Sequence, residues 1–405
     1  MTTKTTIEKR EFEPNNETER KLIPQHPEAF EHLRAGAAVF EQIYLSLPGE
    51  ECSLRVRRSK KPKGTTYTAT LKAERTVTSD GVSRFELEVP LGEAAFDYFA
   101  AQHNLPRVHK RRATMAPGVT IDWIDGLPTP LIEIEQGDLT DESLAVAAEL
   151  QLTSLDVSGN TDWDNDQVAY RLYGMGEQPL PEAIDPLDVV SGMVADLRSG
   201  QQSSVVTLSG MSGSGKTTLA RQVADEIARR YPDLPAPLVV STDDYHRGKV
   251  SLEAAHGAPW TNWDAAEVYD TAQLATDLTA LRRGQAIRLR HFDFTTQEPV
   301  QDGVATPSPF VIVEGIRAAT PDLDGVRTRH YVLPTPAATC LLRDIRRVLE
   351  RPSGSIGTPE ERLRYMLEIG LPTYLEQHQP PRERFSESVR PVGSAALEWL
   401  RQPAE

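Results

Sequence analysis

The sequence has few cysteines. Among its 405 residues only Cys52 and Cys340 occur, each in a different half of the chain. Two distant cysteines cannot form the dense disulfide framework of a small secreted protein, and this usage is typical of a reducing compartment. We therefore expect a cytoplasmic protein.

The sequence also lacks an excess of positive charge and any long apolar run. It contains 44 Lys and Arg against 59 Asp and Glu, which gives a formal net charge of −15. This balance argues against a nucleic acid or an anionic membrane surface as a partner. No apolar run reaches the roughly 18 residues of a membrane-spanning helix. Residues 1–10 lack the apolar core of a secretory signal.

A composition of 39% hydrophobic and 25% charged residues is ordinary for a globular protein, and the length suits two or three domains. Glycine and proline are concentrated between Gly174 and Glu182, which indicates a domain boundary. The sequence therefore predicts a flexible N-terminus at 1–13, a first domain at 14–175, a linker at 176–184 and a second domain at 185–405.

A phosphate-binding loop stands near the start of the second domain. The residues from Gly210 to Thr217 read GMSGSGKT and match the pattern G-x-x-x-x-G-K-[ST]. The β-branched run Ser204–Leu208 predicts a buried strand before the loop, and apolar residues at every fourth position predict a helix after it. In this setting, backbone N–H groups and the helix N-terminus bind phosphate oxygens.

The lysine of such a loop reaches the β- and γ-phosphates of ATP, and the threonine hydroxyl holds Mg²⁺. The residues predicted to bind the cofactor are Gly210, Ser212, Gly213, Ser214, Gly215, Lys216, Thr217 and Thr218.

Two further buried strands deliver acids at their carboxyl ends, where ligands of parallel α/β sheets bind. The run Pro237–Thr242 leads into Asp243, and the run Phe310–Val313 leads into Glu314. Asp243 can deprotonate an acceptor hydroxyl in that place, although an ordinary Asx turn is the alternative. Glu314 is expected to hold the Mg²⁺ shell opposite the loop.

A basic helix begins at Cys340 and places Arg343 and Arg347 on one face. Such arginines can close over the transferring phosphoryl group as a lid. For this helix alone, a solvated basic face is an equally good interpretation.

Several elements of the second half resemble the uridine kinase and phosphoribulokinase family over about residues 185–400. They are Asn262-Trp263-Asp264, Phe292-Asp293-Phe294, Val313-Glu314-Gly315 and Arg343-Asp344. The resemblance implies an α/β P-loop domain with a mostly parallel sheet, which transfers a phosphoryl group from ATP to a nucleoside or sugar-type hydroxyl.

The resemblance also implies roles for individual residues. The catalytic residues would be Asp243, Lys216, Arg343 and Arg347. The acceptor would be bound by Asp264, Phe292 and Asp293. The chain departs from the family at Phe292, which replaces a tyrosine, at Gln297, where a histidine is expected, and at Val348–Arg351, which replaces an R-G-R run. These changes affect nucleoside recognition more than ATP binding, so the acceptor stays open.

Charged residues alternate with apolar ones along several strand-like runs of the first half. Alternate side chains of a strand share a face, so each run places its charges on one side. A single run of this kind usually forms the solvated face of an antiparallel sheet. Because several runs share the pattern and carry both signs, they predict a barrel whose cations hold a polyanion and whose acids hold a divalent metal.

The order of these runs resembles the CYTH superfamily of triphosphate tunnel metalloenzymes over about residues 14–175. Glu17-x-Glu19-x-Lys21 matches the E-x-E-x-K opening, and R-x-R, lysine, E-x-E, K-x-R, aspartate and E-I-E elements follow in order. The resemblance implies an eight-stranded antiparallel tunnel that binds a triphosphate-bearing ligand with Mg²⁺ or Mn²⁺.

By position, the resemblance assigns phosphate binding to Lys21, Arg55, Arg57, Lys72, Lys110 and Arg112. It assigns metal binding to Glu17, Glu19, Glu133 and Glu135, with Glu86, Glu88 and Asp122 as further acidic lining. The acidic stretch Leu152–Tyr173 could cap the tunnel or lie outside it, and of the two we expect a solvated loop.

Three hypotheses follow for the chain. The first is an ATP-dependent kinase fused to a tunnel that binds or hydrolyses a triphosphate. The second places tri- or pyrophosphate hydrolysis in the tunnel and makes the P-loop domain a nucleotide sensor. The third makes the tunnel a non-catalytic binding domain for polyphosphate or nucleotide that regulates the kinase. The oligomeric state stays open.

Overall fold

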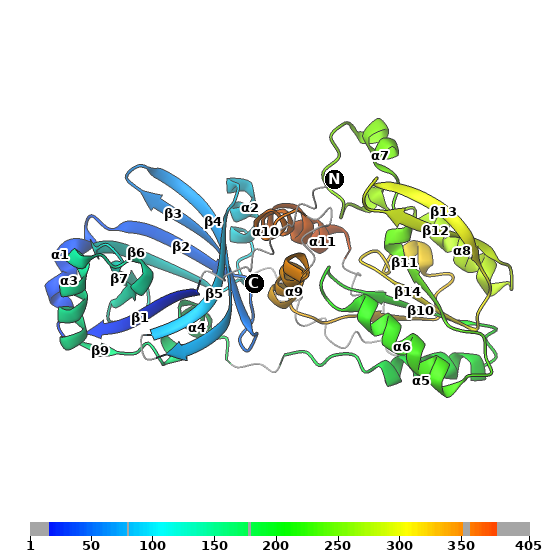
Figure 1. The fold of residues 1–405 in the computed structure, drawn as a ribbon, viewed down its shortest axis with the longest axis horizontal. Coiled ribbons are helices and arrows are strands. Elements are labelled where there is room, and N and C mark those ends of the chain that lie inside the picture. The colour runs from blue at the N-terminus through cyan, green and yellow to red at the C-terminus, as the bar shows by residue number, and fades with distance from the viewer. Residues whose placement is uncertain (1–15, 79–80, 177–179, 351–356, 379–405) are drawn as a thin grey trace, which may run out of the picture. The chain divides into compact units, whose positions relative to one another are not determined.

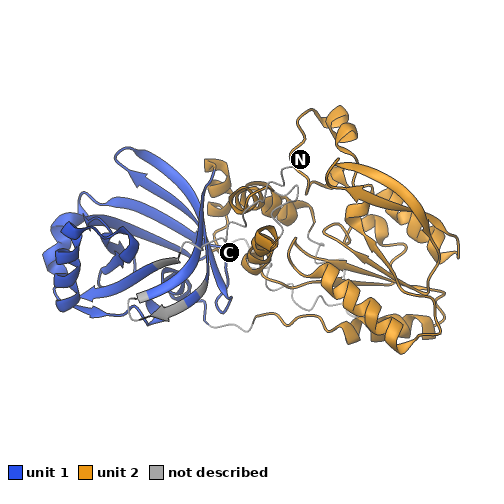
Figure 2. Cartoon of the chain, in the orientation of Figure 1, with its two compact units in different colours: residues 1–91, 106–177 blue, residues 92–105, 178–405 orange. Residues whose placement is uncertain are grey.

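The computed structural model describes residues 16–78, 81–176, 180–350 and 357–378. The chain forms two compact units, one of residues 1–91 with 106–177 and the other of residues 92–105 with 178–405 (Figure 2). The units have separate sheets, so each is described by itself.

An antiparallel barrel forms the first unit (Figure 1). Within the described residues, eight strands follow the order β5-β4-β3-β2-β6-β7-β8-β1, and β1 closes the ring by pairing with both β8 and β5. A ninth strand, β9, pairs with the end of β1. The predicted eight-stranded antiparallel tunnel is confirmed.

The strands of this unit are β1 (Asn16–Pro24), β2 (Ala38–Tyr44), β3 (Cys52–Lys61), β4 (Gly64–Thr78), β5 (Gly81–Pro90), β6 (Arg107–Ala116), β7 (Val119–Ile124), β8 (Leu131–Glu135) and β9 (Ser154–Asp156). Its helices are α1 (Glu31–Arg34), α3 (Asp141–Leu152) and α4 (Asn165–Leu172), with 3-10 turns at Pro27–Phe30, Gln136–Asp138 and Thr161–Trp163.

The strand register gathers the charged residues of the barrel on one face. Lys21 of β1 lies opposite Glu133 of β8, and opposed residues of an antiparallel pair share a face. The other face is apolar, and Ile121 and Ile132 pack there in one cluster with Leu150 of α3. Because the apolar face carries the helix on the outside, the charged face lines the interior.

Helix α4 packs against residues at one end of this interior. Tyr170 of α4 meets Tyr44 edge to face, with ring centroids 6.3 Å apart. Just before the helix, the buried carboxylate of Asp164 accepts a hydrogen bond from Lys21 Nζ at 2.7 Å. The expectation of a solvated acidic loop in this stretch is therefore wrong, because barrel closure buries part of it.

A parallel sheet forms the centre of the second unit (Figure 1). Its described strands follow the order β11 (Leu238–Ser241), β14 (Phe310–Glu314), β10 (Ser204–Ser209) and β15 (Arg329–Val332), and every pairing is parallel. A separate antiparallel hairpin contains β12 (Ile287–Asp293) and β13 (Glu298–Ala305). The predicted α/β domain with a mostly parallel sheet is confirmed.

Helices cover both faces of the parallel sheet. Val206 of β10 faces α5 (Pro186–Arg198) and α6 (Lys216–Arg230). Its neighbour Val205 faces the opposite way and packs in the cluster of α8 (Thr271–Arg282). Both faces of the central strands β10 and β14 are thus buried, which explains their continuous apolar runs in the sequence.

The remaining described helices of the second unit are α2 (Glu93–Ala100), α7 (Lys249–His256), α9 (Ala337–Glu350), α10 (Pro359–Tyr365) and α11 (Leu371–Gln377). Short 3-10 turns lie at Thr242–Tyr245, Ala266–Val268 and Pro321–Leu323, and a π-helical turn, Met366–Gly370, joins α10 to α11. None of the helices in the described part combines the length and apolar character that a transmembrane helix needs.

Candidate functional site

The phosphate-binding loop connects β10 to α6, as the motif predicts. Gly210, Gly213 and Gly215 have φ angles of 157°, 79° and 98°, which residues with a Cβ rarely adopt. A Cβ on Gly213 would lie 2.2 Å from the backbone oxygen of Cys340, so only glycine lets the loop pack on α9. Gly215 is the N-cap residue of α6, so the unpaired N–H groups of the first helical turn are at the loop.

Two side chains of the loop suit a phosphate ligand. Lys216 Nζ donates a hydrogen bond to the Met211 carbonyl oxygen at 2.9 Å, so this side chain folds back along the loop. The Ser214 hydroxyl is buried and has no hydrogen-bond partner within the described residues. Since a buried polar group without a partner is costly, a phosphate oxygen would satisfy it.

Thr217 and Glu314 are brought together at the end of the central strands. Glu314 is 6% exposed, and its carboxylate contacts the Thr217 hydroxyl. Burial raises the pKa of Glu314, Lys216 lowers it, and the nearby Asp243 raises it further. The Thr217 hydroxyl and the Glu314 carboxylate supply oxygen ligands, which Mg²⁺ prefers. The nearby Asp243 carboxylate repels Glu314, and a bound cation would relieve this repulsion.

Asp243 lies in the 3-10 turn after β11, close to the same groups, and its side chain is 48% exposed. The burial of the other half of this side chain raises the pKa of Asp243, and Asp264 adds to this effect, while Lys216 and Arg347 oppose it. These interactions bring together groups from five separate parts of the sequence, at residues 216–217, 243, 264, 314 and 347.

Helix α9 brings its arginines to this place. Arg343 Nη1 lies 3.9 Å from the point that a Cβ on Gly215 would occupy. Asp344 is 3% exposed and binds Arg347 at 3.4 Å and Arg362 at 2.6 Å. A buried carboxylate therefore orients Arg347, whose charge acts on Asp243.

The three residues predicted to bind the acceptor differ in their surroundings. Asp264 accepts a hydrogen bond from the Tyr365 hydroxyl at 2.7 Å, and it lies near enough to Asp243 to raise the pKa of that residue. Phe292 is 1% exposed and forms part of an aromatic cluster. Asp293 instead accepts a hydrogen bond from Thr296 Oγ1 at 2.9 Å within its own hairpin turn.

The charged residues predicted for the tunnel form a dense network on the interior face. A carboxylate from another strand or from the segment before α4 pairs with each of Lys21, Arg57, Lys72, Lys110 and Arg112. The pairs are Lys21 with Asp164 at 2.7 Å, Lys72 with Glu86 at 2.5 Å, Arg57 with Glu88 at 3.0 Å, Lys110 with Asp122 at 2.6 Å, and Arg112 with Asp122 at 2.6 Å and with Glu133.

Positive charge is nevertheless crowded on one side of this interior. Burial lowers the pKa of Arg57, and the adjacent Arg55 and Arg112 lower it further. Burial and Arg112 likewise lower the pKa of Lys110. The Nε atoms of Arg55 and Arg57 are buried and have no hydrogen-bond partner within the described residues. A bound polyanion would relieve this repulsion and supply the missing acceptors.

Three glutamates lie close together on the paired strands β1 and β8. Glu19 lies opposite Glu135 in the β1–β8 register. Burial and the neighbouring Glu133 raise the pKa of Glu135. Carboxylates that repel each other are hard oxygen ligands suited to Mg²⁺ or Mn²⁺. Within the described residues, however, no group of three or more such side chains is already arranged around a metal position. The side chain of Glu17 lies outside the described part of the structure.

Comparison with known proteins agrees with the division of the chain into a barrel unit and a parallel-sheet unit. Residues 205–326 match the model of the Phosphoribulokinase / Uridine kinase family, and residues 15–163 match that of the CYTH domain. A uridine kinase from Shewanella sp. (strain W3-18-1) is 31% identical over 158 residues, which cover 38% of this chain and 73% of that protein. The chain belongs to the phosphoribulokinase/uridine kinase family. A CYTH domain precedes its kinase-family domain.

Solved structures show weaker likeness. A possible uridine kinase from Bacillus stearothermophilus has 17% sequence identity and a TM-score of 0.30, and the alignment covers 48% of this chain and 98% of that one. A Hippeastrum protein described as revealing a dominant triphosphatase activity has 15% identity and a TM-score of 0.24, with 45% and 96% coverage.

The kinase-family domain contains a residue that the motifs did not identify. His246 is 7% exposed, and both of its ring nitrogens are buried without a hydrogen-bond partner in the described structure. The rings of Trp263, Tyr269, Phe292 and Phe294 surround it at centroid distances of 4.6–6.3 Å. Burial lowers the pKa of His246 to about 4, so it is neutral at neutral pH. Its position three residues after Asp243 was the available signal.

The CYTH domain also contains two charged residues that the sequence patterns did not identify, Arg84 and Asp164. Arg84 contacts Glu19 and lies 3.5 Å from Asp164. Arg84 alternates with Glu86 and Glu88 along β5, so strand periodicity could have identified it. Asp164 follows no strand pattern, and only the closed barrel reveals its place beside Lys21.

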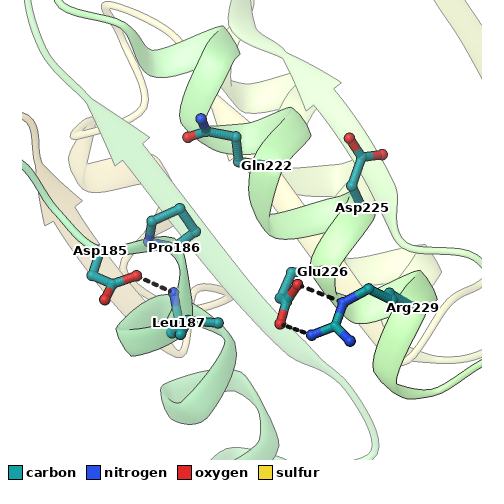
Figure 3. A pocket seen from close by; sticks show the side chains of 7 residues that line it. All are labelled: Asp185, Pro186, Leu187, Gln222, Asp225, Glu226 and Arg229. Carbon is teal, nitrogen blue, oxygen red and sulfur yellow. Dashed lines mark hydrogen bonds and ion pairs between the residues drawn. The ribbon is translucent and has the colours of Figure 1, made fainter.

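A groove of about 370 Å³ lies on the kinase-family domain and contains none of the site residues described above (Figure 3). It runs between the start of α5, at Asp185 and Leu187, and the face of α6 that carries Gln222, Glu226 and Arg229. Glu226 and Arg229 already bind each other at 2.7 Å. The groove shares no residue with the phosphate-binding loop, and we assign it no role.

Proposed function

We propose that the kinase-family domain transfers the γ-phosphoryl group of ATP to a hydroxyl of a small acceptor of the nucleoside or sugar type. The convergence of Lys216, Thr217, Asp243 and Glu314 at the end of the parallel sheet carries this proposal. We propose that this domain spans 185–405, the linker 176–184 and the CYTH domain 14–175, although residues 92–105 of the last range belong to the second compact unit.

Each group at this site has a chemical role in the proposed transfer. The glycine loop and the first turn of α6 bind the phosphates, and Lys216 reaches the transferred group. Mg²⁺, held by Thr217 and Glu314, supplies charge neutralisation when bound. Asp243 accepts the proton of the acceptor hydroxyl, a task that its raised pKa suits. Arg343 and Arg347 stabilise the developing negative charge.

The acceptor lies against Asp264 and the aromatic cluster in this proposal. Asp264 accepts hydrogen bonds from acceptor hydroxyls, while Phe292 and its neighbours provide a flat apolar wall. Asp293 caps the hairpin turn beside that wall.

The proposal is tested with the purified chain, ATP, Mg²⁺ and a panel containing uridine, cytidine, adenosine and ribose. We expect acceptor-dependent ADP release with at least one compound. Asp243→Asn should lower this rate by about a hundredfold or more, since it removes the general base. Asp225→Asn, an exposed aspartate of α6, is the matched control. The absence of acceptor-dependent turnover across the panel would rule out this kinase activity.

We also propose that the CYTH domain binds a triphosphate-bearing compound and hydrolyses it with Mg²⁺ or Mn²⁺. The crowding of Arg55, Arg57, Lys110 and Arg112, which lowers the pKa of Arg57 and Lys110, supports a polyanionic ligand. Glu19, Glu133 and Glu135 would hold the metal. The complete set of ionisable residues favours hydrolysis over binding alone.

Phosphate release from tripolyphosphate tests this second activity. We expect Lys21→Ala or Glu133→Gln to lower metal-dependent release by at least about a hundredfold, because each removes a charge from the interior network. Lys216→Ala should leave release unchanged. Binding of tripolyphosphate without release would instead favour the regulatory hypothesis. Loss of release in Lys216→Ala would place the hydrolysis at the P-loop.

A further inference from the structure

The segment that carries Asp264 has little regular structure of its own. Between α7 and the 3-10 turn at Ala266–Val268, residues 257–265 contain neither helix nor strand. A carboxylate on such a segment is held in one orientation only if other elements fix it. The C-terminal helices α10 and α11, with the π-helical turn between them, provide those contacts.

The contacts hold residues on both sides of Asp264 and the backbone of Asp264 itself. Before it, Asn262 Nδ2 donates to Thr373 Oγ1 at 3.1 Å. After it, the Ala266 N–H donates to Gln377 Oε1 at 2.8 Å. The ring nitrogen Nε2 of His378 also hydrogen-bonds the carbonyl oxygen of Asp264 itself. These partners all belong to α11 or to the residue that follows it.

The side chain of Asp264 is held from α10. The Tyr365 hydroxyl donates to Asp264 Oδ2 at 2.7 Å. A carboxylate has two oxygens that accept hydrogen bonds, so Tyr365 engages Oδ2 and leaves Oδ1 for another donor. Burial and Asp264 raise the pKa of the Tyr365 hydroxyl, so it remains protonated and keeps donating throughout the working pH range. The π-helical turn begins at the next residue, and such turns often occur at functional sites.

We propose that Tyr365 is a positioning residue for phosphoryl transfer, which fixes the Asp264 carboxylate so that Oδ1 receives the acceptor hydroxyl. The C-terminal helices are thereby part of the acceptor site, although they lie beyond residues 205–326 that match the kinase family model. This inference rests on the proposed kinase function.

The kinetic test compares Tyr365→Phe with Tyr231→Phe in the full chain. Tyr231 is a partly buried tyrosine of the same unit that packs on Phe310. With the acceptor found in the panel, Tyr365→Phe should raise the acceptor KM by about tenfold, since hydrogen bonds to charged groups are strong. The ATP KM and kcat should change less than about twofold. An unchanged acceptor KM, or an equal rise in both KM values, would overturn the proposal.

A double-mutant cycle separates positioning from a general structural role. In an Asp264→Asn background, Tyr365→Phe should raise the acceptor KM by less than about twofold, because the charged partner is already gone. A full tenfold effect in that background would mean that Tyr365 acts elsewhere.

A second measurement does not need an acceptor. Hydrogen–deuterium exchange of peptides covering residues 258–268 should be faster in Tyr365→Phe than in the wild-type chain or in Tyr231→Phe. Unchanged exchange would refute the positioning role even if the kinase proposal stands. If no acceptor in the panel is phosphorylated, the kinase proposal fails. Faster exchange in Tyr365→Phe would then show only that Tyr365 holds the segment around Asp264 in place.

Discussion

Arg57 and Arg58 are neighbours on β3, but the strand directs them to opposite faces of the barrel. Arg57 binds Glu88 on the interior at 3.0 Å, while Arg58 binds Glu41 at 2.5 Å on the other face. Burial and the adjacent cations Arg55 and Arg112 lower the pKa of Arg57. At the scale of single residues, the face to which a strand directs a side chain therefore decides whether its charge can contact a ligand inside the tunnel.

This pair provides a matched prediction. Arg57→Ala should weaken the binding of tripolyphosphate by at least about tenfold, because it removes a charge-assisted donor from a desolvated site. Arg58→Ala should change it by less than about twofold, since this residue faces away from the interior. Isothermal titration calorimetry with both variants checks this. Equal losses would show that net charge, and not position, governs binding.

Pairing between β10 and β15 shows what a single element contributes. His330 of β15 is 5% exposed and links two hydroxyls of β10, with Nδ1 2.6 Å from Thr207 Oγ1 and Nε2 3.1 Å from Ser209 Oγ. Burial lowers the pKa of His330 from 6.5 to about 3. The strand that leads into the phosphate-binding loop is thus attached to its neighbour through a neutral histidine.

This element makes a pH-dependent prediction. As pH falls below about 6.5, the unfolded chain binds a proton that the folded His330 refuses, so the free energy of unfolding decreases until about pH 3. When the pH falls from 7 to 5, the free energy of unfolding should therefore decrease by about 2 kcal/mol less in His330→Asn than in the wild type. Urea unfolding at both pH values measures this difference. His291→Asn, with a side chain that is 63% exposed, should behave like the wild type.

The whole molecule combines two proposed phosphate sites built on different principles. The kinase-family domain would bind phosphate through backbone N–H groups and a helix N-terminus, whereas the CYTH domain would bind it through charged side chains inside a closed sheet. Each unit has its own hydrophobic core. Ligands that bind one folded unit should stabilise that unit by mass action.

Thermal unfolding should show this separation. With Mg²⁺ present, tripolyphosphate should raise the midpoint of one unfolding transition, and a non-hydrolysable ATP analogue should raise the midpoint of another. Lys216→Ala should remove the second shift and retain the first. Differential scanning calorimetry of the full chain makes the comparison. A single transition that responds equally to both ligands would contradict independent units.

Much of the fold follows from local patterns in the sequence. Alternation of charged and apolar residues places Lys21 and Arg57 on one face of their strands, and the G-x-x-x-x-G-K-T spacing specifies the loop that ends at Thr217. Both signals depend only on residues a few positions apart. In contrast, β15 has only four residues, which is too short for a clear periodic pattern, and the structure alone identifies it.

The sequence by itself therefore determined the two families, the order of the domains and the face on which the charges of strands such as β1 and β3 lie, because these depend on spacing along the chain. The tertiary structure alone decided which distant residues meet. Asp164 reaches Lys21 only when the barrel closes, and Tyr365 reaches Asp264 only when the C-terminal helices pack. Burial and hydrogen bonding between such residues depend on packing across the fold, which no local pattern encodes.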